Sequence, residues 1–205
     1  MTEIFTLQNI LVILGAYLFG SIPWALVIGK VFYKTDVREH GSGNLGGSNA
    51  GRVLGKKAGI SVTILDALKS TFTVLICSIW FKEVMIIAGL AVCFGHCFPI
   101  FAKFKGGKAV ATTMGYFLGV GIVTGQFLAI FLLPIAIFFG TLYLCKMVSL
   151  SSMIAIGIEA IVSFFIQPDM TLSLSFVALF LFVTYRHKSN IKRIMNHEEK
   201  KITWM

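Results

Sequence analysis

Seven apolar stretches dominate this chain, near 5–30, 59–80, 84–101, 109–125, 127–145, 149–166 and 171–185. A helix needs about 20 apolar residues to cross the hydrocarbon core of a bilayer, and the third and seventh stretches are the short ones. The third stretch also contains Gly95, His96 and Pro99, so we expect its end to break into a loop or a short helix. Hydrophobic residues make up 57% of the chain, and its mean hydropathy is +0.86. These observations predict an all-α, polytopic transmembrane helical bundle with seven spans; five spans with two partial segments is the alternative.

The basic residues predict how such a bundle is oriented. With the N-terminus outside, the inner segments hold 16 of the 18 lysines and arginines, and only Lys69 and Lys82 fall elsewhere. The positive-inside rule favours this orientation, which also makes the C-terminus cytoplasmic. The start of the chain carries Glu3 and no early basic residue, so we expect the first apolar stretch to remain as a span rather than act as a signal peptide. The length of 205 residues suits one membrane domain over 1–205.

A polar, glycine-rich segment, residues 41–52, stands out between the first two apolar stretches. It reads Gly41-Ser42-Gly43-Asn44-Leu45-Gly46-Gly47-Ser48-Asn49-Ala50-Gly51-Arg52. Glycine allows the backbone to approach a phosphate closely, and arginine offers a fork of charge-assisted donors. The segment is therefore a candidate phosphate site, although a plain flexible loop with Arg52 on lipid headgroups is the simpler interpretation.

A second polar patch follows the third apolar stretch on the same expected side. Gly106-Gly107-Lys108 precedes the fourth stretch, where a helix N-terminus and a lysine both favour an anion. The patch is not a nucleotide-binding P-loop, because Ala109 stands where that motif needs Ser or Thr. Lys103 and Lys105 are interpreted as ordinary positive-inside anchors. His96 is either a general base or a hydrogen-bonding tie for the loop.

Other polar residues are less specific. Asp66 and Lys69 are three residues apart, so an internal ion pair is favoured over direct contact with a substrate. Ser149, Ser151 and Ser152 suit helix capping. The basic segment 186–193 indicates an anchor for anionic lipid, although Asn190 and Arg193 are spaced to share one helix face.

Several functions are disfavoured by the composition. The net charge of +9 does not indicate nucleic-acid binding, because the basic residues flank apolar spans without a soluble binding module. Cys93 and Cys97 lie one helical turn apart beside His96, but buried cysteine commonly serves as a small apolar residue, so no metal is expected. Acidic residues are too scarce on the inner side for an obvious magnesium cluster.

Together, three motifs resemble the bacterial acyl-phosphate:glycerol-3-phosphate acyltransferases over nearly the whole chain. The first is Gly41-Ser42-Gly43-Asn44 with Asn49 and Arg52; the second runs from Gly95-His96-Cys97-Phe98-Pro99 to Phe104-Lys105-Gly106-Gly107-Lys108; the third is His187 with Asn190-Ile191-Lys192-Arg193. The resemblance implies an enzyme of the bacterial cytoplasmic (inner) membrane with a cytoplasmic active site. It implies transfer of a fatty acyl group from acyl phosphate to the 1-hydroxyl of glycerol 3-phosphate, giving lysophosphatidic acid for phospholipid synthesis. No cofactor and no obligatory protein partner is implied.

The resemblance and the local chemistry together nominate two sets of site residues. The candidate catalytic residues are Ser42, Asn44, Arg52, His96 and Lys108. The candidate substrate-binding residues are Gly43, Gly46, Ser48, Asn49, Gly106, Gly107, Ser149, Ser152 and Asn190. Arg52 and Lys108 are assigned to phosphate. The good leaving group of an acyl phosphate makes a covalent acyl-enzyme unnecessary, and the base is either His96 or a substrate phosphate oxygen.

The chain departs mildly from the family pattern. Leu45, Gly47 and Ser48 stand where proline, alanine and threonine are usual, and Ala109 and His197 each replace a common glycine. Two other functions stay open as alternatives. A transporter of a phosphorylated metabolite would need polar groups near mid-membrane and matching broken helices, whereas a non-catalytic scaffold would tolerate the loss of Arg52.

Overall fold

The computed structural model describes residues 6–202, and all regular secondary structure within that range is helical. The chain forms two compact units, Met1–Val123 (unit 1) and Thr124–Met205 (unit 2). The all-α expectation is therefore confirmed for the described residues. The two units are considered separately below.

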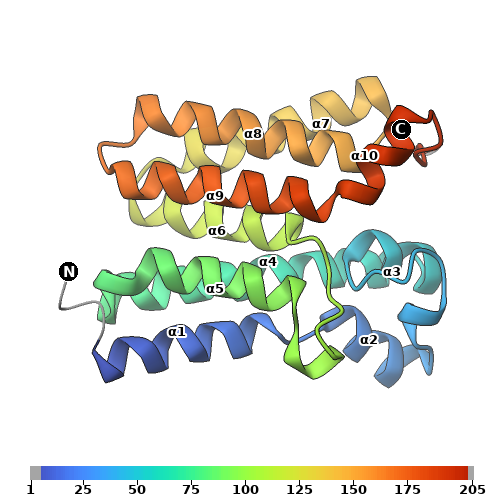
Figure 1. The fold of residues 1–205 in the computed structure, drawn as a ribbon, viewed down its shortest axis with the longest axis horizontal. Helices are drawn as coiled ribbons and strands as arrows, with labels where there is room; N and C mark the ends of the chain where they lie inside the picture. The colour runs from blue at the N-terminus through green and yellow to red at the C-terminus, as the bar shows by residue number, and fades with distance from the viewer. Residues whose placement is uncertain (1–5, 203–205) are drawn as a thin grey trace. The chain divides into compact units, whose positions relative to one another are not determined.

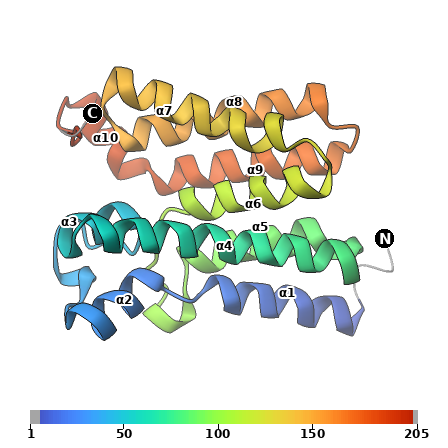
Figure 2. The same cartoon turned by 180° about the vertical axis from the view of Figure 1, so that it is seen from behind.

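Unit 1 contains the first six α-helices. Figure 1 and Figure 2 show α1 running beside α5, and α4 lying against α6. Short 3-10 turns separate some of these helices. The elements are α1 (Leu7–Gly20), α2 (Trp24–Tyr33), η1 (Val37–Glu39), α3 (Gly47–Leu54), α4 (Lys56–Trp80), η2 (Lys82–Val84), α5 (Met85–Cys97), η3 (Ile100–Ala102) and α6 (Val110–Val123).

The first apolar stretch is broken rather than continuous. α1 ends at Gly20 and α2 begins at Trp24, with a bend of 42° between them. Pro23 stands at the N-cap of α2, and proline cannot donate the backbone hydrogen bond that would continue α1. The expected break after the third stretch is confirmed, because α5 ends at Cys97 and only η3 follows before the loop to α6.

Glycines bring the helices of unit 1 into close contact. A Cβ atom on Gly20 would lie 2.4 Å from the carbonyl oxygen of Val92, and one on Gly95 would lie 2.3 Å from that of Tyr17. α1 and α5 therefore approach too closely for any larger residue at these two positions. A Cβ on Gly59 of α4 would similarly meet the Cα of Gly51 in α3 at 2.6 Å. Small residues serve this purpose widely in membrane helices, where close backbone approach increases the packing energy.

Unit 2 is an assembly of three long helices and a short terminal one. A π-helical turn over Leu128–Leu132 leads into α7 (Leu133–Cys145), which packs on α8 (Val148–Ile166). α9 (Met170–Arg186) returns antiparallel to α8, and α10 (Lys188–Met195) turns away from it by 62°.

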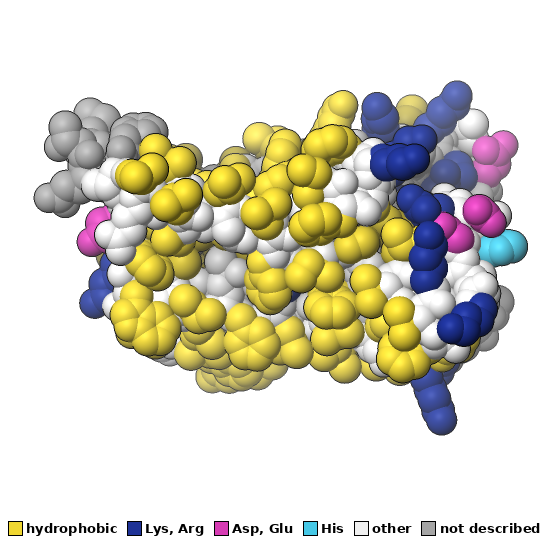
Figure 3. Space-filling view, turned by 90° about the horizontal axis from the view of Figure 1, so that it is seen from below, with side chains coloured by type: hydrophobic (Ala, Val, Ile, Leu, Met, Phe, Trp, Pro, Cys, Tyr) yellow, Lys and Arg dark blue, Asp and Glu magenta, His cyan; other side chains and the backbone are white. Residues whose placement is uncertain are grey.

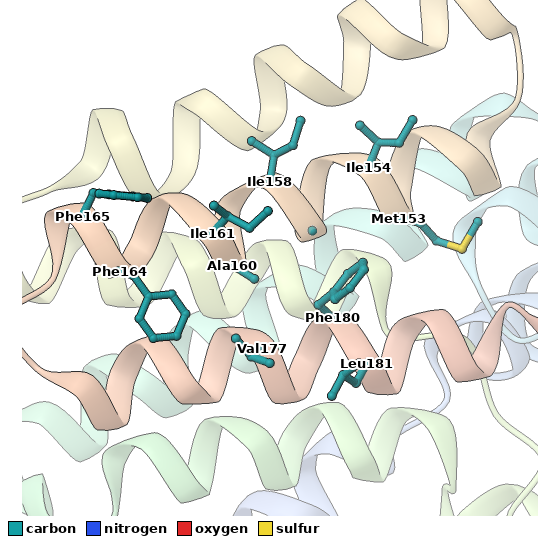
Figure 4. Close-up of a pocket in the computed structure, with 11 residues that line it drawn as sticks. Met153, Ile154, Ile158, Ala160, Ile161, Phe164, Phe165, Val177, Phe180 and Leu181 are labelled. Atoms are coloured by element: carbon teal, nitrogen blue, oxygen red, sulfur yellow. The ribbon is translucent and has the colours of Figure 1, made fainter.

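An apolar groove of about 730 Å³ runs along α8 and α9. Figure 4 shows Phe164 and Ile161 from α8 and Val177, Phe180 and Leu181 from α9 around it. Because its lining is almost entirely hydrocarbon, this groove suits lipid tails and not phosphate chemistry.

Among the described residues, four helices are long and apolar enough to cross a membrane by themselves, and the count is six if each bent pair forms one span. The shorter apolar helix is α6, with 14 residues, about 21 Å of helix at 1.5 Å per residue. Length and composition thus support four to six spans. The prediction of seven spans holds only if the short helix α6 also crosses the membrane.

Candidate functional site

The glycine-rich segment folds around the buried side chain of Asn49. Its amide nitrogen donates to the carbonyl oxygens of Val37 and His40, at 3.0 and 3.2 Å. Its amide oxygen accepts from the backbone N–H of Ser42 at 2.8 Å and from the Ser42 hydroxyl at 3.1 Å. Asn49 is 1% exposed, so in this structure it shapes the loop from within.

The loop presents polar side chains outward from this anchor. Gly41 and Gly43 adopt φ of +65° and +67°, a left-handed backbone that glycine adopts without steric cost. Ser42, between these two glycines, is exposed, and Asn44, which follows Gly43, is half-buried. Leu45, which stands where the family commonly has proline, is 2% exposed and belongs to the apolar cluster beneath the loop. The loop is therefore fastened at both ends while its tip stays open to solvent.

Ser48 and Arg52 lie one turn apart on the exposed face of α3. The Arg52 Nε–H donates to the carbonyl oxygen of Ser48 at 3.0 Å, which orients the guanidinium along that face. Gly46 is the N-cap of α3, so the first-turn N–H groups and Arg52 belong to the same short helix. This arrangement offers an anion several donors from one element.

Asp36 was not nominated from the sequence, yet it organises the neighbouring loop. It pairs with the guanidinium of Arg38 at 2.6 Å and lies 3.5 Å from the Nζ of Lys30. The hydrogen bond from the Arg38 side chain, which outweighs the effect of partial burial, holds the pKa of Asp36 well below its usual range. Arg38 is therefore occupied by Asp36, which distinguishes it from Arg52.

The second patch is a tight turn built against His96. The backbone N–H of Gly106 donates to the carbonyl of Cys97 at 3.2 Å, and that of Gly107 donates to the carbonyl of His96 at 3.0 Å. A Cβ on Gly107 would lie 2.0 Å from the His96 Nε2. These two N–H groups are used within the turn, so the glycines act here by allowing close packing on His96. Lys108 follows at a half-buried position.

A buried ionic cluster lies behind His96. The Asp66 and Lys69 side chains, each 1% exposed, form the expected ion pair at 2.9 Å. The His96 Nδ1 lies 3.1 Å from the Lys69 Nζ and 3.3 Å from the Asp66 Oδ1. The internal ion pair predicted from the three-residue spacing is thus confirmed, and His96 is attached to it.

The third group of candidates meets in unit 2 on Glu199. Its Oε1 accepts from the Ser149 hydroxyl at 2.7 Å and from the Asn190 amide at 2.6 Å, and Arg193 Nε donates to its Oε2 at 2.7 Å. The expectation that the serines cap α8 is wrong: Met147 is the N-cap, with no side-chain bond. Ser152 instead donates to the carbonyl of Val148 within the helix. Glu199 was missed, and its only sequence signal was an acidic residue inside a basic tail.

Eleven of the fourteen nominated residues lie in unit 1, where they form separate local contacts within the two loops. Ser42 contacts Asn49, Arg52 bonds to Ser48, and His96 packs on Gly107, whereas Ser149 and Asn190 join the Glu199 cluster of unit 2. On the face drawn in Figure 3, lysine and arginine side chains gather toward the end that holds α2 and α3. Within residues 6–202, no group of three His, Cys, Asp or Glu side chains is placed to hold a metal ion.

Apolar helices with exposed hydrophobic faces define an integral membrane protein, and its two polar, cationic loops are candidate places for anions. A family model described as glycerol-3-phosphate acyltransferase matches residues 10–197. Glycerol-3-phosphate acyltransferases from Bacillus subtilis (strain 168) and Listeria monocytogenes EGD-e are each 46% identical to the chain, over 95% and 98% of its length and 98% and 100% of theirs.

Solved structures agree with these sequence matches. The crystal structure of PlsY (YgiH), an integral membrane glycerol 3-phosphate acyltransferase, in its glycerol 3-phosphate form, has a TM-score of 0.87 at 32% identity and 95% coverage of both chains. Its lysophosphatidic acid form has a TM-score of 0.84. The chain belongs to the glycerol-3-phosphate acyltransferase family. The resemblance seen in the sequence is thereby confirmed, and the protein is an acyltransferase of the membrane.

Proposed function

We propose that this protein transfers a fatty acyl group from acyl phosphate to the 1-hydroxyl of glycerol 3-phosphate. The products are lysophosphatidic acid and inorganic phosphate. The observation that carries this proposal is the pair of separate cationic loops, one ending in Arg52 on α3 and the other in Lys108 before α6. A reaction between two anionic substrates needs two cationic loops, one for each phosphate group. Structural relatives described in glycerol 3-phosphate and lysophosphatidic acid forms support the acceptor and the product.

The nominated site residues have different roles in the proposed reaction. Arg52 and Lys108 bind phosphate, and Ser42, Asn44 and Ser48 position the substrates by hydrogen bonding. Asn49, Gly43, Gly46, Gly106 and Gly107 act by shaping the two loops. Ser149, Ser152 and Asn190, which belong to unit 2, are also proposed as substrate-binding residues, and Glu199 orders Ser149 and Asn190.

Transfer is direct in this proposal. The 1-hydroxyl oxygen bonds to the acyl carbonyl carbon, the bond from that carbon to the phosphate oxygen breaks, and the hydroxyl proton passes to a base. That base is His96 or a substrate phosphate oxygen. Phosphate is already a good leaving group, so orientation and charge stabilisation by the cationic loops supply the catalysis, without a metal, a cofactor or an acyl-enzyme.

The enzyme is proposed to lie in the bacterial inner membrane with seven spans, the N-terminus outside and the active site cytoplasmic. The distribution of basic residues supports this orientation. α6 serves as the short seventh span, and nine of its 14 residues are buried, including Thr112, Tyr116 and Phe117. A helix covered by other helices does not need to match the bilayer thickness on its own.

The broken first span does not indicate a transporter. Transporters use freed carbonyls at such a break to coordinate ions. Here the carbonyl oxygens of Gly20 and Ile22 accept from the Lys69 side chain, at 2.9 and 3.3 Å. The break is therefore filled by a cation of the protein itself.

The donor and the direct route are tested together with purified protein in lipid nanodiscs. Palmitoyl phosphate is expected to acylate labelled glycerol 3-phosphate, while palmitoyl-CoA at the same concentration gives no product. Intact mass spectrometry after incubation with palmitoyl phosphate alone is expected to show no palmitoylated protein. Acylation from palmitoyl-CoA alone would overturn the donor, and a stable palmitoyl adduct that glycerol 3-phosphate removes would overturn the direct route.

A further inference from the structure

Lys69 occupies an unusual position for a lysine, buried in the middle of a helix. Its Nζ lies 2.9 Å from Asp66 Oδ1, 2.9 Å from the Gly20 carbonyl oxygen, 3.3 Å from that of Ile22 and 3.1 Å from His96 Nδ1. The two carbonyl oxygens and His96 Nδ1 are the hydrogen-bond partners of its three N–H donors, whereas Asp66, whose carboxylate oxygens have no hydrogen-bond partner among the described residues, is held as an ion pair. The ammonium group thus ties α4 to the break in the first span and to the end of α5.

The contact between Lys69 and His96 determines where the histidine carries its proton. An ammonium group has three N–H donors and no acceptor, so a bond with Nδ1 requires a lone pair there. If Nδ1 were protonated, two donors would face each other at 3.1 Å. A neutral imidazole with a lone pair on Nδ1 carries its proton on Nε2.

Asp66 stabilises the buried ammonium group of Lys69. Its Oδ1 balances the ammonium charge at 2.9 Å, and a charge buried without a partner would be strongly unfavourable. Asp66 alone would favour the opposite tautomer, because its Oδ1 lies 3.3 Å from Nδ1 and would accept a proton from it. Lys69 therefore decides between the two tautomers.

We propose that Lys69, held in place by Asp66, fixes His96 as the tautomer with its proton on Nε2, so that His96 donates a hydrogen bond at the site instead of acting as the base. The catalytic part of this inference rests on the proposed function. Lys69 and Asp66 are positioning residues that act through His96. The Nε2 atom packs against Gly107, which places this donor at the turn that leads into Lys108. The proton of the 1-hydroxyl then passes to a substrate phosphate oxygen.

His187 provides an internal comparison. Its Nδ1 lies 2.8 Å from the carbonyl oxygen of Val183, which can only accept, so its neutral ring carries the proton on Nδ1. The remaining histidines, His40 and His197, are exposed. The protein thus contains two buried histidines that are expected to carry their ring protons on opposite nitrogens, and two exposed histidines.

Nitrogen-15 NMR of histidine-labelled, full-length protein in nanodiscs at neutral pH tests the assignment without any substrate. The His96 signals, identified by their loss in His96→Gln, are expected to show a protonated Nε2 and a bare Nδ1, with the reverse for His187. A His96 ring protonated on Nδ1, alone or together with Nε2, would overturn the proposal. Because no turnover is needed, a protein with the expected tautomer that stays inactive with palmitoyl phosphate would contradict only the proposed function.

Variants then test whether Lys69 positions the His96 ring or only stabilises the fold. In Lys69→Met, His96 Nδ1 faces only Asp66, so its tautomer should reverse and turnover should fall at least tenfold. The matched control is Thr71→Val on the same helix, which removes a buried hydrogen bond to Gly115 and should leave the His96 signals unchanged. If Lys69→Met does not fold, His96→Gln against His96→Leu decides instead. Glutamine keeps a donor near the Nε2 position and should retain at least ten times the activity of leucine; equal activities of the two variants would overturn the donor role.

Discussion

At the residue level, two departures from the family pattern fall on left-handed backbone. Ala109 and His197 stand where the family commonly has glycine, and their φ angles are +58° and +58°. Glycine adopts this region without the steric cost that a Cβ atom brings. The family preference for glycine at both positions thus has a conformational cause, and this chain tolerates the strain.

Ala109→Gly should therefore stabilise the protein. An alanine in the left-handed region costs about 1.5 kcal/mol, and the lost burial of one methyl offsets about 0.8 kcal/mol of this gain, so we expect the free energy of unfolding to rise by roughly 0.7 kcal/mol. The measurement is the thermal unfolding midpoint of the purified protein in detergent, which should rise. A lower midpoint would show that packing of the Ala109 methyl dominates over backbone strain.

Gly107→Ala tests the contact between the second loop and His96. The added methyl would overlap His96 Nε2, displacing either the ring or the turn, and misplacement of about 1 Å in a site can cost roughly 100-fold in rate. We expect a fall of about that size in kcat/KM with glycerol 3-phosphate. Gly15→Ala in α1 is the control, because a Cβ there meets nothing within 4 Å and its activity should be unchanged. Full activity in Gly107→Ala would rule out this contact as part of the site.

At the level of helices, the sequence predicted the elements well where length and apolarity decide them. α4, α8 and α9 coincide closely with apolar stretches, because a long hydrocarbon run has few other stable conformations in a bilayer. The break at Pro23 was not foreseen. It is stabilised by Lys69 from α4, 49 residues after Gly20, and single-sequence patterns do not show such distant partners.

The candidate site was predictable to a similar degree. The two loops were recognisable from glycine and basic residues, since these residue types are rare beside apolar spans. The division of labour within the loops was not, because Asn49 and Gly107 act through contacts with Val37, His40 and His96 that only the fold brings about. Glu199 escaped notice for the same reason: its partners Ser149 and Asn190 come from two different helices.

The tail after α10 should depend on the charge of Glu199. Burial alone would raise the pKa of this carboxyl, but hydrogen bonds from Ser149, Asn190 and Arg193 outweigh burial and lower it. A lowered pKa means that the carboxylate stabilises the folded tail above the ordinary carboxyl range, near pH 4.3, and that this stabilisation is lost as the pH falls through the lowered value. A fluorine label on Lys200→Cys should therefore gain mobility only below about pH 4.3.

Glu199→Gln provides the matching experiment at neutral pH. Loss of one charge-assisted hydrogen bond, about 1.5 kcal/mol, corresponds to roughly tenfold faster hydrogen exchange in residues 188–202. Lys200→Gln, at an exposed neighbouring position, is the control. Unchanged exchange in Glu199→Gln would show that the apolar contacts of α10 hold the tail without the carboxylate.

At the level of the whole molecule, lipid contact and polar chemistry are assigned to different surfaces. Large apolar side chains are exposed along the apolar helices of both units, such as Leu11 on α1, Ile64 on α4 and Phe165 on α8. Such exposure is unfavourable in water but suits hydrocarbon. The basic residues instead lie mostly at helix ends, in the connecting loops and in the short helices α3 and α10, with Lys69 as the buried exception. This division is what an enzyme joining a lipid-soluble acyl donor to a water-soluble phosphate requires.

The most direct test is phosphate release from palmitoyl phosphate by the purified protein in nanodiscs, with and without glycerol 3-phosphate. Release should require glycerol 3-phosphate and should fall about 100-fold or more in Lys108→Ala, the loss expected on removing a charge-stabilising group. Lys105→Ala, an exposed lysine of the same loop, should release phosphate like the unmodified protein. Absence of release from folded protein, or equal release in Lys108→Ala, would contradict the assignment of these loops to phosphoryl substrates.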